Sequence, residues 1–359
     1  MKEQISGIQF ITLMIWLILG TGVLTLPSSI NQFARFQDGW IVTALMYIVP
    51  LILAVFGRIY FQINGNRDFW RVLEQTFGHT IGIALSSWIG IWLYICTCTI
   101  VREFGVFIEI NFLPRTPICV TAALILLPTS YCIYNGIETL SRMSLLVSFS
   151  VCIGLIINCI FMATKWHSLY FLPLLTKGWQ PVIEASIYPW AFTSELIIAL
   201  FLLPSLKTPK KIAKYLIISG SIISSFAMLI EVLSISVLGR VGMFAVYPLL
   251  KAIREISIGI FLQRLEPLYV VLVIGSVFIK LTLFQQVFTN SVQTIVRIED
   301  KRDIIWSLGL AVWEGSSFFF QNDMDLNNFI LFTFPFYTFS ISLFIPMLLL
   351  ATQLMFKRK

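Results

Sequence analysis

Charged residues are scarce in this sequence. Asp, Glu, Lys and Arg together make up 12% of its 359 residues, against roughly 25% in an average soluble domain. No polar stretch is long enough to form a separate enzymatic domain, and the few polar residues do not offer a nucleophile, a base and an orienting group in one place. We therefore expect a protein that is not an enzyme.

Histidine and regularly spaced cysteine are scarce as well. Only His79 and His167 are present, and a single residue separates Cys96 from Cys98, so neither a metal site of usual spacing nor a disulfide framework is predicted. No other cofactor is predicted. The sequence pI is about 9.1, but the basic residues fall at the ends of apolar stretches, which indicates membrane topology and no nucleic-acid partner.

Apolar residues are abundant: 58% of the chain is hydrophobic, and the mean hydropathy is +0.88. A bilayer core of about 30 Å is crossed by about 20 helical residues. We predict an all-α polytopic membrane protein in contact with membrane lipid. Its first apolar stretch follows only one basic residue, Lys2, and is expected to remain as a span rather than to be cleaved. The apolar runs give about ten candidate spans, at residues 8–33, 40–61, 80–107, 117–133, 142–163, 184–204, 213–238, 267–288, 304–320 and 329–352.

The orientation follows from the basic loops. The short loop Lys207-Thr-Pro-Lys-Lys marks a cytoplasmic side, which makes both termini cytoplasmic. On the opposite side, the 239–266 connection has the apolar pattern of a short amphipathic helix from Tyr247-Pro248 onward. We expect that helix to lie against the outer face.

Two spans contain residues that interrupt a helix. The first has Gly20-Thr21-Gly22, and the sixth, about half a chain length later, has Pro189 ahead of Glu195. In transporters built on inverted repeats, paired broken helices expose half-helix ends that suit a zwitterion such as an amino acid. The alternative is close packing through small residues and aromatic rings. The predicted substrate-binding residues are Gly20, Thr21, Gly22, Trp190, Phe192, Thr193 and Ser194.

Three ionisable residues lie well inside predicted spans: Glu195, Glu231 and Lys280. A charge at such depth is costly unless it is paired or hydrated, so each is a candidate for a functional or coupling role. Lys280 is predicted either to lie beside the first span in place of a coupling cation or to be a counter-charge to one of the glutamates. Glu231 has a structural alternative as a hydrogen-bonded carboxyl. Arg102 and Glu103 are expected near the outer interface.

Several strings resemble one family, the endospore germination permeases, which are the B subunits of spore germinant receptors in the amino acid/polyamine/organocation superfamily. Arg102, Glu195 and Lys280 match its third, sixth and eighth spans. One departure is that the sixth span lacks a glycine beside Glu195. The matching strings are Ile5-Ser6-Gly7-Ile8-Gln9-Phe10, Gly20-Thr21-Gly22-Val23-Leu24-Thr25-Leu26-Pro27, Gln37-Asp38-Gly39-Trp40, Arg115-Thr116-Pro117, Tyr247-Pro248-Leu249-Leu250, Arg254 to Glu266 and Phe278-Ile279-Lys280.

The resemblance implies a five-plus-five inverted repeat with broken first and sixth spans. On that basis we expect one transmembrane domain over residues 1–359, with approximate halves 1–163 and 184–352. It also implies the spore inner membrane, assembly with a receptor A subunit and a C lipoprotein subunit, and recognition of a small nutrient germinant. A proton-coupled amino acid transporter and an assembly subunit with a vestigial pocket remain alternatives.

Overall fold

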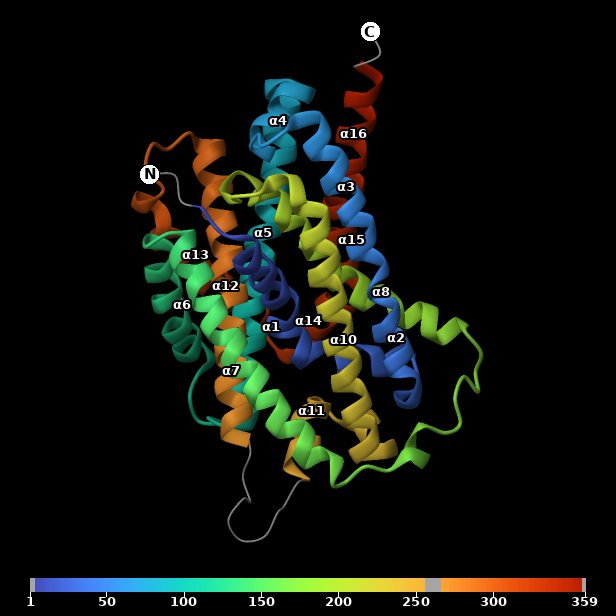
Figure 1. Cartoon of the computed structure of the whole chain (residues 1–359). Helices are drawn as coiled ribbons and strands as arrows, with labels where there is room; N and C mark the ends of the chain where they lie inside the picture. The colour runs from blue at the N-terminus through green and yellow to red at the C-terminus, as the bar shows by residue number, and fades with distance from the viewer. Residues whose placement is uncertain (1–3, 256–265, 357–359) are drawn as a thin grey trace.

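The computed structural model describes residues 4–255 and 266–356, and those residues are almost entirely helical (Figure 1). Long apolar runs without periodic polar breaks favour helices that satisfy their own backbone hydrogen bonds in lipid. The α-helices are α1 (Gly7–Phe33), α2 (Gly39–Leu45), α3 (Ile48–Asn64), α4 (Phe69–Phe77), α5 (His79–Asn111), α6 (Ile118–Tyr134), α7 (Ile137–Ala163), α8 (Gln180–Ser194), α9 (Ile198–Phe201), α10 (Ile212–Leu238), α11 (Pro248–Arg254), α12 (Glu266–Val296), α13 (Arg302–Phe318), α14 (Asp323–Asn328), α15 (Phe334–Phe339) and α16 (Ile345–Phe356).

The predicted multi-pass membrane architecture is confirmed. Seven helical segments of the described chain are long and apolar enough to cross a membrane. The other predicted spans coincide with α6, with the interrupted pair α8 and α9, and with α13, which are shorter or broken. The count of ten therefore stays a prediction. The qualifying segments are Gly7–Phe33, Phe36–Asn64, His79–Asn111, Ile137–Ala163, Pro209–Phe244, Glu266–Val296 and Asp323–Met355.

Helix α1 is the central element, and it packs against α7, α8, α10 and α12 (Figure 1). It begins with a capping box: the Ser6 amide donates to Gln9 Oε1 at 2.8 Å, and the Gln9 amide donates to Ser6 Oγ at 3.4 Å. These bonds satisfy backbone donors that a helix start leaves open. The cap fixes where the central helix begins.

The predicted break in the first span is wrong, because α1 runs without interruption from Gly7 to Phe33. A methyl carbon on Gly20 would lie 2.7 Å from Lys280 Cβ and 2.9 Å from the Ser276 carbonyl oxygen of α12. The missing side chain therefore lets two helices approach closely, which is the packing alternative. The sixth span is interrupted as predicted: α8 gives way to the 3₁₀ turn η3 (Glu195–Ile197) before α9.

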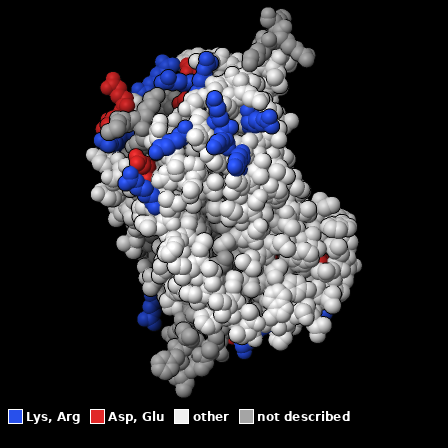
Figure 2. Space-filling model, in the orientation of Figure 1, with Lys and Arg blue, Asp and Glu red and all other residues white. Residues whose placement is uncertain are grey.

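Both termini lie at one end of the molecule (Figure 1), and Figure 2 shows Lys and Arg side chains gathered at that end. There the N-terminal segment pairs with the loop after α9, since the Ile5 amide donates to the Ser205 carbonyl at 2.8 Å and the Lys207 amide to the Ile5 carbonyl at 3.0 Å. The side chain of Ile5 is fully buried. This arrangement is the one that cytoplasmic termini and a basic cytoplasmic loop require.

The amphipathic helix predicted after Tyr247 is present as α11, at the opposite end of the molecule (Figure 1). Its apolar residues Leu250 and Ile253 are buried against the bundle. The part of the prediction that falls on residues 256–265 lies outside the described residues, as do the germination-permease strings there.

Candidate functional site

A buried ion pair joins the two predicted coupling residues of α12 and the sixth span. Lys280 Nζ lies 2.8 Å from Glu195 Oε2, and it donates to Thr21 Oγ1 at 3.1 Å. The side chains of Lys280 and Glu195 are 1% and 3% exposed. Of the alternatives for Lys280, the structure shows a position beside the first span together with a counter-charge to Glu195.

Each member of this cluster comes from a different helix. Thr21 lies at the middle of α1, Lys280 lies near the middle of α12, and Glu195 opens the 3₁₀ turn that interrupts the sixth span. A 3₁₀ turn within a helix often marks a functional hinge, because its hydrogen bonds are weaker than those of an α-helix. The ion pair therefore joins a rigid helix to a segment that can change its geometry.

Aromatic rings surround the ammonium group. Lys280 Nζ lies 5.3 Å from the ring centre of Phe192 and 5.6 Å from that of Phe284. Cation–π attraction adds to the ion pair when the charge is desolvated. A buried pair of this kind contributes little net stability, because removing two charges from water costs several kcal/mol. A role in specificity or in ligand binding accounts for the pair better than a role in stability.

The ion pair lines a small cavity of about 250 Å³. That figure includes open space at the cavity's boundary, and the room between the lining side chains is about that of one water molecule. An amino acid therefore binds there only if the lining side chains move apart. Side chains of Phe192, Ile330 and Phe334 form its apolar walls. The full lining is Thr21, Cys96, Thr99, Ile100, Glu103, Phe192, Glu195, Lys280, Ile330 and Phe334.

Glu103 is a member of this site, and its predicted position near the outer interface is wrong. It is 5% exposed, lines the cavity, and its Oε1 has no hydrogen-bond partner in the described chain. Arg102 is buried too, at 8% exposure. Helix α5 continues to Asn111, so Glu103 lies about two turns inside it. The signal that could have found it is the length of the apolar run beyond residue 107.

A larger, more polar vestibule lies beyond this cavity, towards the end opposite the termini, with about 1,010 Å³ of empty space when the open solvent at its mouth is included. Ile330 lines both spaces. Burial raises the pKa of Tyr247 well above its usual range, so this vestibule residue is a neutral phenol. The vestibule gives a partly polar route to Ile330. Its lining includes Thr25, Ser28, Asn31, Gln32, Tyr247, Asp323 and Asn327.

Five of the seven predicted substrate-binding residues, Gly20, Gly22, Trp190, Thr193 and Ser194, do not line this cavity. Gly22 lines a separate small cavity with Glu231. Trp190 donates from Nε1 to the Leu45 carbonyl at 2.9 Å, and Thr193 bonds to carbonyl oxygens of its own helix. Ser194 is fully buried, with no partner for its hydroxyl within the described part of the chain. Of the seven predicted residues, Thr21 and Phe192 line the cavity that holds the ion pair.

Glu231 stands apart from that ion pair. It is 1% exposed, and neither carboxylate oxygen has a hydrogen-bond partner among the described residues. Burying an unpaired carboxylate is costlier than burying an amide.

We expect Glu231→Gln to leave the thermal unfolding temperature in detergent unchanged or raised. The matched control Glu195→Gln, which breaks the ion pair, is expected to lower it. A large drop for Glu231→Gln would indicate that its carboxylate holds a bound cation.

Solved secondary transporters share this fold. MHP1, a nucleobase-cation-symport-1 family transporter in a closed conformation with bromovinylhydantoin bound, matches with a TM-score of 0.68 over 98% of this chain and 78% of its own, at 11% identity. MhsT in complex with L-phenylalanine matches with a TM-score of 0.61 over 99% of both chains, at 13% identity. This chain therefore has the helical membrane-protein fold of these two structures.

The chain belongs to the spore germination protein family, whose model matches residues 4–322. Spore germination protein KB of Bacillus subtilis (strain 168) is 24% identical over 323 residues, which cover 87% of this chain and 84% of that protein. Spore germination protein XB of Bacillus anthracis is 26% identical over 282 residues, covering 77% and 78%. The resemblance to germination permeases is confirmed, and the family and fold are those of permease-like membrane proteins rather than enzymes.

Proposed function

We propose that this protein is the nutrient-sensing, permease-like subunit of a spore germination receptor, and that a small nutrient binds at the Lys280–Glu195 cavity. The observation that carries the proposal is the buried ion pair, which meets Thr21 of the central helix at the interruption of the sixth span. Groups of both charges line one closed cavity. Buried ionisable groups within a membrane protein default to functional sites.

An amino acid has the chemistry that this cavity can bind. Its carboxylate can pair with the ammonium of Lys280, and its ammonium can pair with Glu103, whose Oε1 has no partner within residues 4–255 and 266–356. Lys280 then lies between the ligand carboxylate and Glu195, and the two glutamates leave the cavity with one excess negative charge. Pairing both ends of a zwitterion inside a low-dielectric site is favourable only when both counter-charges are present. MhsT, which shares the fold, has been solved in complex with L-phenylalanine, and an amino acid ligand here is consistent with that complex.

Binding requires the closed site to open. The vestibule supplies the outer route, and Ile330 separates it from the cavity. Ile330 belongs to a π-helical turn, Phe329–Thr333, and such turns occur frequently at functional sites. At the end of the molecule that holds the termini, the backbone pairing of Ile5 with the loop after α9 closes the bundle. A nutrient that favours the open arrangement shifts the population towards it.

Germination is then triggered because nutrient binding at this site is coupled to a conformational change in other receptor subunits. We assign the protein to the spore inner membrane, with a receptor A subunit and a C lipoprotein subunit as its partners, because it belongs to the germination family. Coupling energies of about 1–3 kcal/mol are typical of such switches. One transmembrane unit of two related halves provides the moving parts.

The test is binding of a panel of labelled amino acids to the purified protein in detergent. Ile100→Trp fills the cavity, since Ile100 lines it. Ile91→Trp places the same bulk on the same helix at a residue that is 51% exposed. We expect saturable binding of at least one amino acid, lost in Ile100→Trp and kept in Ile91→Trp. Equal binding by the two folded variants would contradict the assigned site.

A proton-coupled amino acid transporter is the second candidate, and the same buried carboxylates favour it. Two glutamates face one lysine in the cavity, so a proton can balance the charge when a ligand arrives. Uptake of the bound amino acid into proteoliposomes, driven by an imposed pH gradient, distinguishes the two candidates. Binding without flux supports the receptor subunit, and flux that follows the pH gradient supports the transporter.

A further inference from the structure

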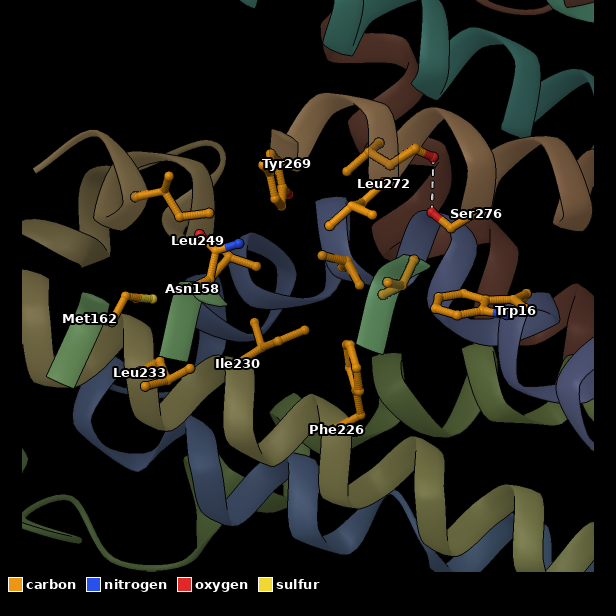
Figure 3. A pocket seen from close by; sticks show the side chains of 14 residues that line it. Trp16, Asn158, Met162, Phe226, Ile230, Leu233, Leu249, Tyr269, Leu272 and Ser276 are labelled. Carbon is orange, nitrogen blue, oxygen red and sulfur yellow. Dashed lines mark hydrogen bonds between the residues drawn. The ribbon is translucent and has the colours of Figure 1, made fainter. Parts of the chain in front are cut away.

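Another cavity, whose lining does not include the ion pair, lies between α1, α7, α10, α11 and α12 (Figure 3). It encloses about 540 Å³ of space not occupied by atoms, its open boundary included. Apolar side chains supply nearly all of its wall. Within the part of the chain that the structure describes, no charged side chain lines it. The lining is Trp16, Val23, Val151, Asn158, Met162, Phe226, Ile230, Leu233, Leu249, Ile253, Tyr269, Leu272, Val273 and Ser276.

Two polar atoms in this wall have no partner. Tyr269 and Asn158 are each 5% exposed, and the Tyr269 hydroxyl and Asn158 Oδ1 make no hydrogen bond within the described residues. Asn158 uses its Nδ2 on the Gly154 carbonyl, at 2.8 Å. Leaving such atoms unsatisfied costs about 1–3 kcal/mol each. They are available for one polar group of a ligand.

The two unpartnered polar atoms lie away from one side of the cavity. Figure 3 shows Tyr269 and Asn158 apart from Trp16 and Ser276, which lie on the opposite side. Ser276 donates its hydroxyl to the Val273 carbonyl at 2.9 Å. The lining repeats at two-turn spacing, from Tyr269 to Ser276 and from Val151 to Asn158, which is about 10 Å along each helix. The polar end is the one nearer α11 and the outer face.

This shape selects a class of ligand. With C–C bonds of about 1.5 Å, an alkyl chain of roughly six to eight carbons spans the distance between these lining residues. A hydroxyl both donates and accepts, so it can accept from the Tyr269 hydroxyl and donate to Asn158 Oδ1. An ammonium or carboxylate would be buried without a counter-charge, which is costly.

We propose that this cavity is a binding site for an uncharged alkyl chain that ends in a hydroxyl, with the hydroxyl at Tyr269 and Asn158 and the chain towards Trp16. Free alcohols and hydroxyl-bearing lipids such as diacylglycerol share this chemistry. The site adjoins the ion pair: Ser276 lines the cavity, and its carbonyl oxygen faces Gly20 of α1. Lys280 follows about one helical turn later.

The experiment is photolabelling of the purified full chain with a diazirine-bearing octanol, followed by peptide mapping. Ile230→Trp fills the cavity, and Leu229→Trp adds the same bulk at the neighbouring residue of α10, which is 36% exposed. We expect saturable labelling of α7, α10 or α12 that Ile230→Trp abolishes and Leu229→Trp retains. Labelling that does not saturate, or that survives Ile230→Trp, would overturn the proposal.

The conservative variant Tyr269→Phe tests the polar end without emptying the core. Loss of one hydrogen bond should lower the affinity of Tyr269→Phe for the octanol probe by roughly two- to tenfold. The matching alkane probe, which has no hydroxyl, should label Tyr269→Phe and the unaltered protein equally. Equal affinity of the octanol probe for both proteins would refute the polar assignment. Competition by diacylglycerol in phospholipid nanodiscs would assign the site to a lipid, and its failure would assign it to free alcohols.

Discussion

Replacing Lys280 by methionine will destabilise the protein and abolish nutrient binding. The substitution leaves Glu195 buried at 2% exposure without its partner, and removing one member of a buried ion pair typically costs about 3–5 kcal/mol. Binding is lost because the cation that would meet the ligand carboxylate is gone. Denaturant or thermal unfolding in detergent measures the first effect, and binding of a labelled amino acid measures the second.

The double variant Lys280→Met with Glu195→Gln separates stability from function. Because the amide of glutamine is uncharged, the double variant should be more stable than Lys280→Met alone, so the two destabilisations should not add. Nutrient binding should stay lost in both. If Lys280→Met were as stable as the unaltered protein, the ion pair would not exist in the membrane.

Gly20→Ala will separate α1 from α12 and disturb the ion pair from a distance. The added methyl group meets a backbone oxygen at 2.9 Å, which cannot rotate away, as well as Lys280 Cβ at 2.7 Å. Overpacking of this kind typically costs about 1–3 kcal/mol. Both the unfolding free energy and nutrient affinity should fall, since Lys280 is displaced relative to Thr21.

Gly22→Ala is the matched control, two residues along the same helix. A methyl group there meets only the side chain of Leu26, at 3.1 Å, and that side chain can move. We expect Gly22→Ala to fold and bind nearly normally, helped by the higher helix propensity of alanine. If Gly20→Ala and Gly22→Ala lost stability and nutrient affinity equally, α1 would have to unwind at these glycines, contrary to the structure.

The positions of the helices could be predicted from the sequence, because a membrane-spanning helix is signalled by its own run of apolar residues. The ion pair could be predicted in part for the same reason: Glu195 and Lys280 are charges inside apolar runs. Their partnership could not, since they are separated by 85 positions in the chain. Only the packing of α12 and of the sixth span against α1 brings them to 2.8 Å.

Gly20 shows why part of the site could not be predicted from the sequence. A glycine that permits unwinding and one that permits close packing are the same residue in the sequence. Their difference lies in what faces the glycine, here the Ser276 carbonyl of a helix far along the chain. The vestibule could not be predicted for a similar reason, because its wall combines α1, α5, α14 and the segment before α11.

The most direct test of the central claim uses Cys96, which lies in the wall of the Lys280–Glu195 cavity. In a variant whose other cysteines are replaced by alanine, the rate of Cys96 modification by a small thiol reagent is measured with and without a bound amino acid. The control keeps Cys98 instead, whose Sγ faces the Val312 carbonyl of α13. The account predicts that the amino acid protects Cys96 at the concentrations at which it binds and leaves Cys98 unaffected. Full occupancy without protection of Cys96 would contradict it.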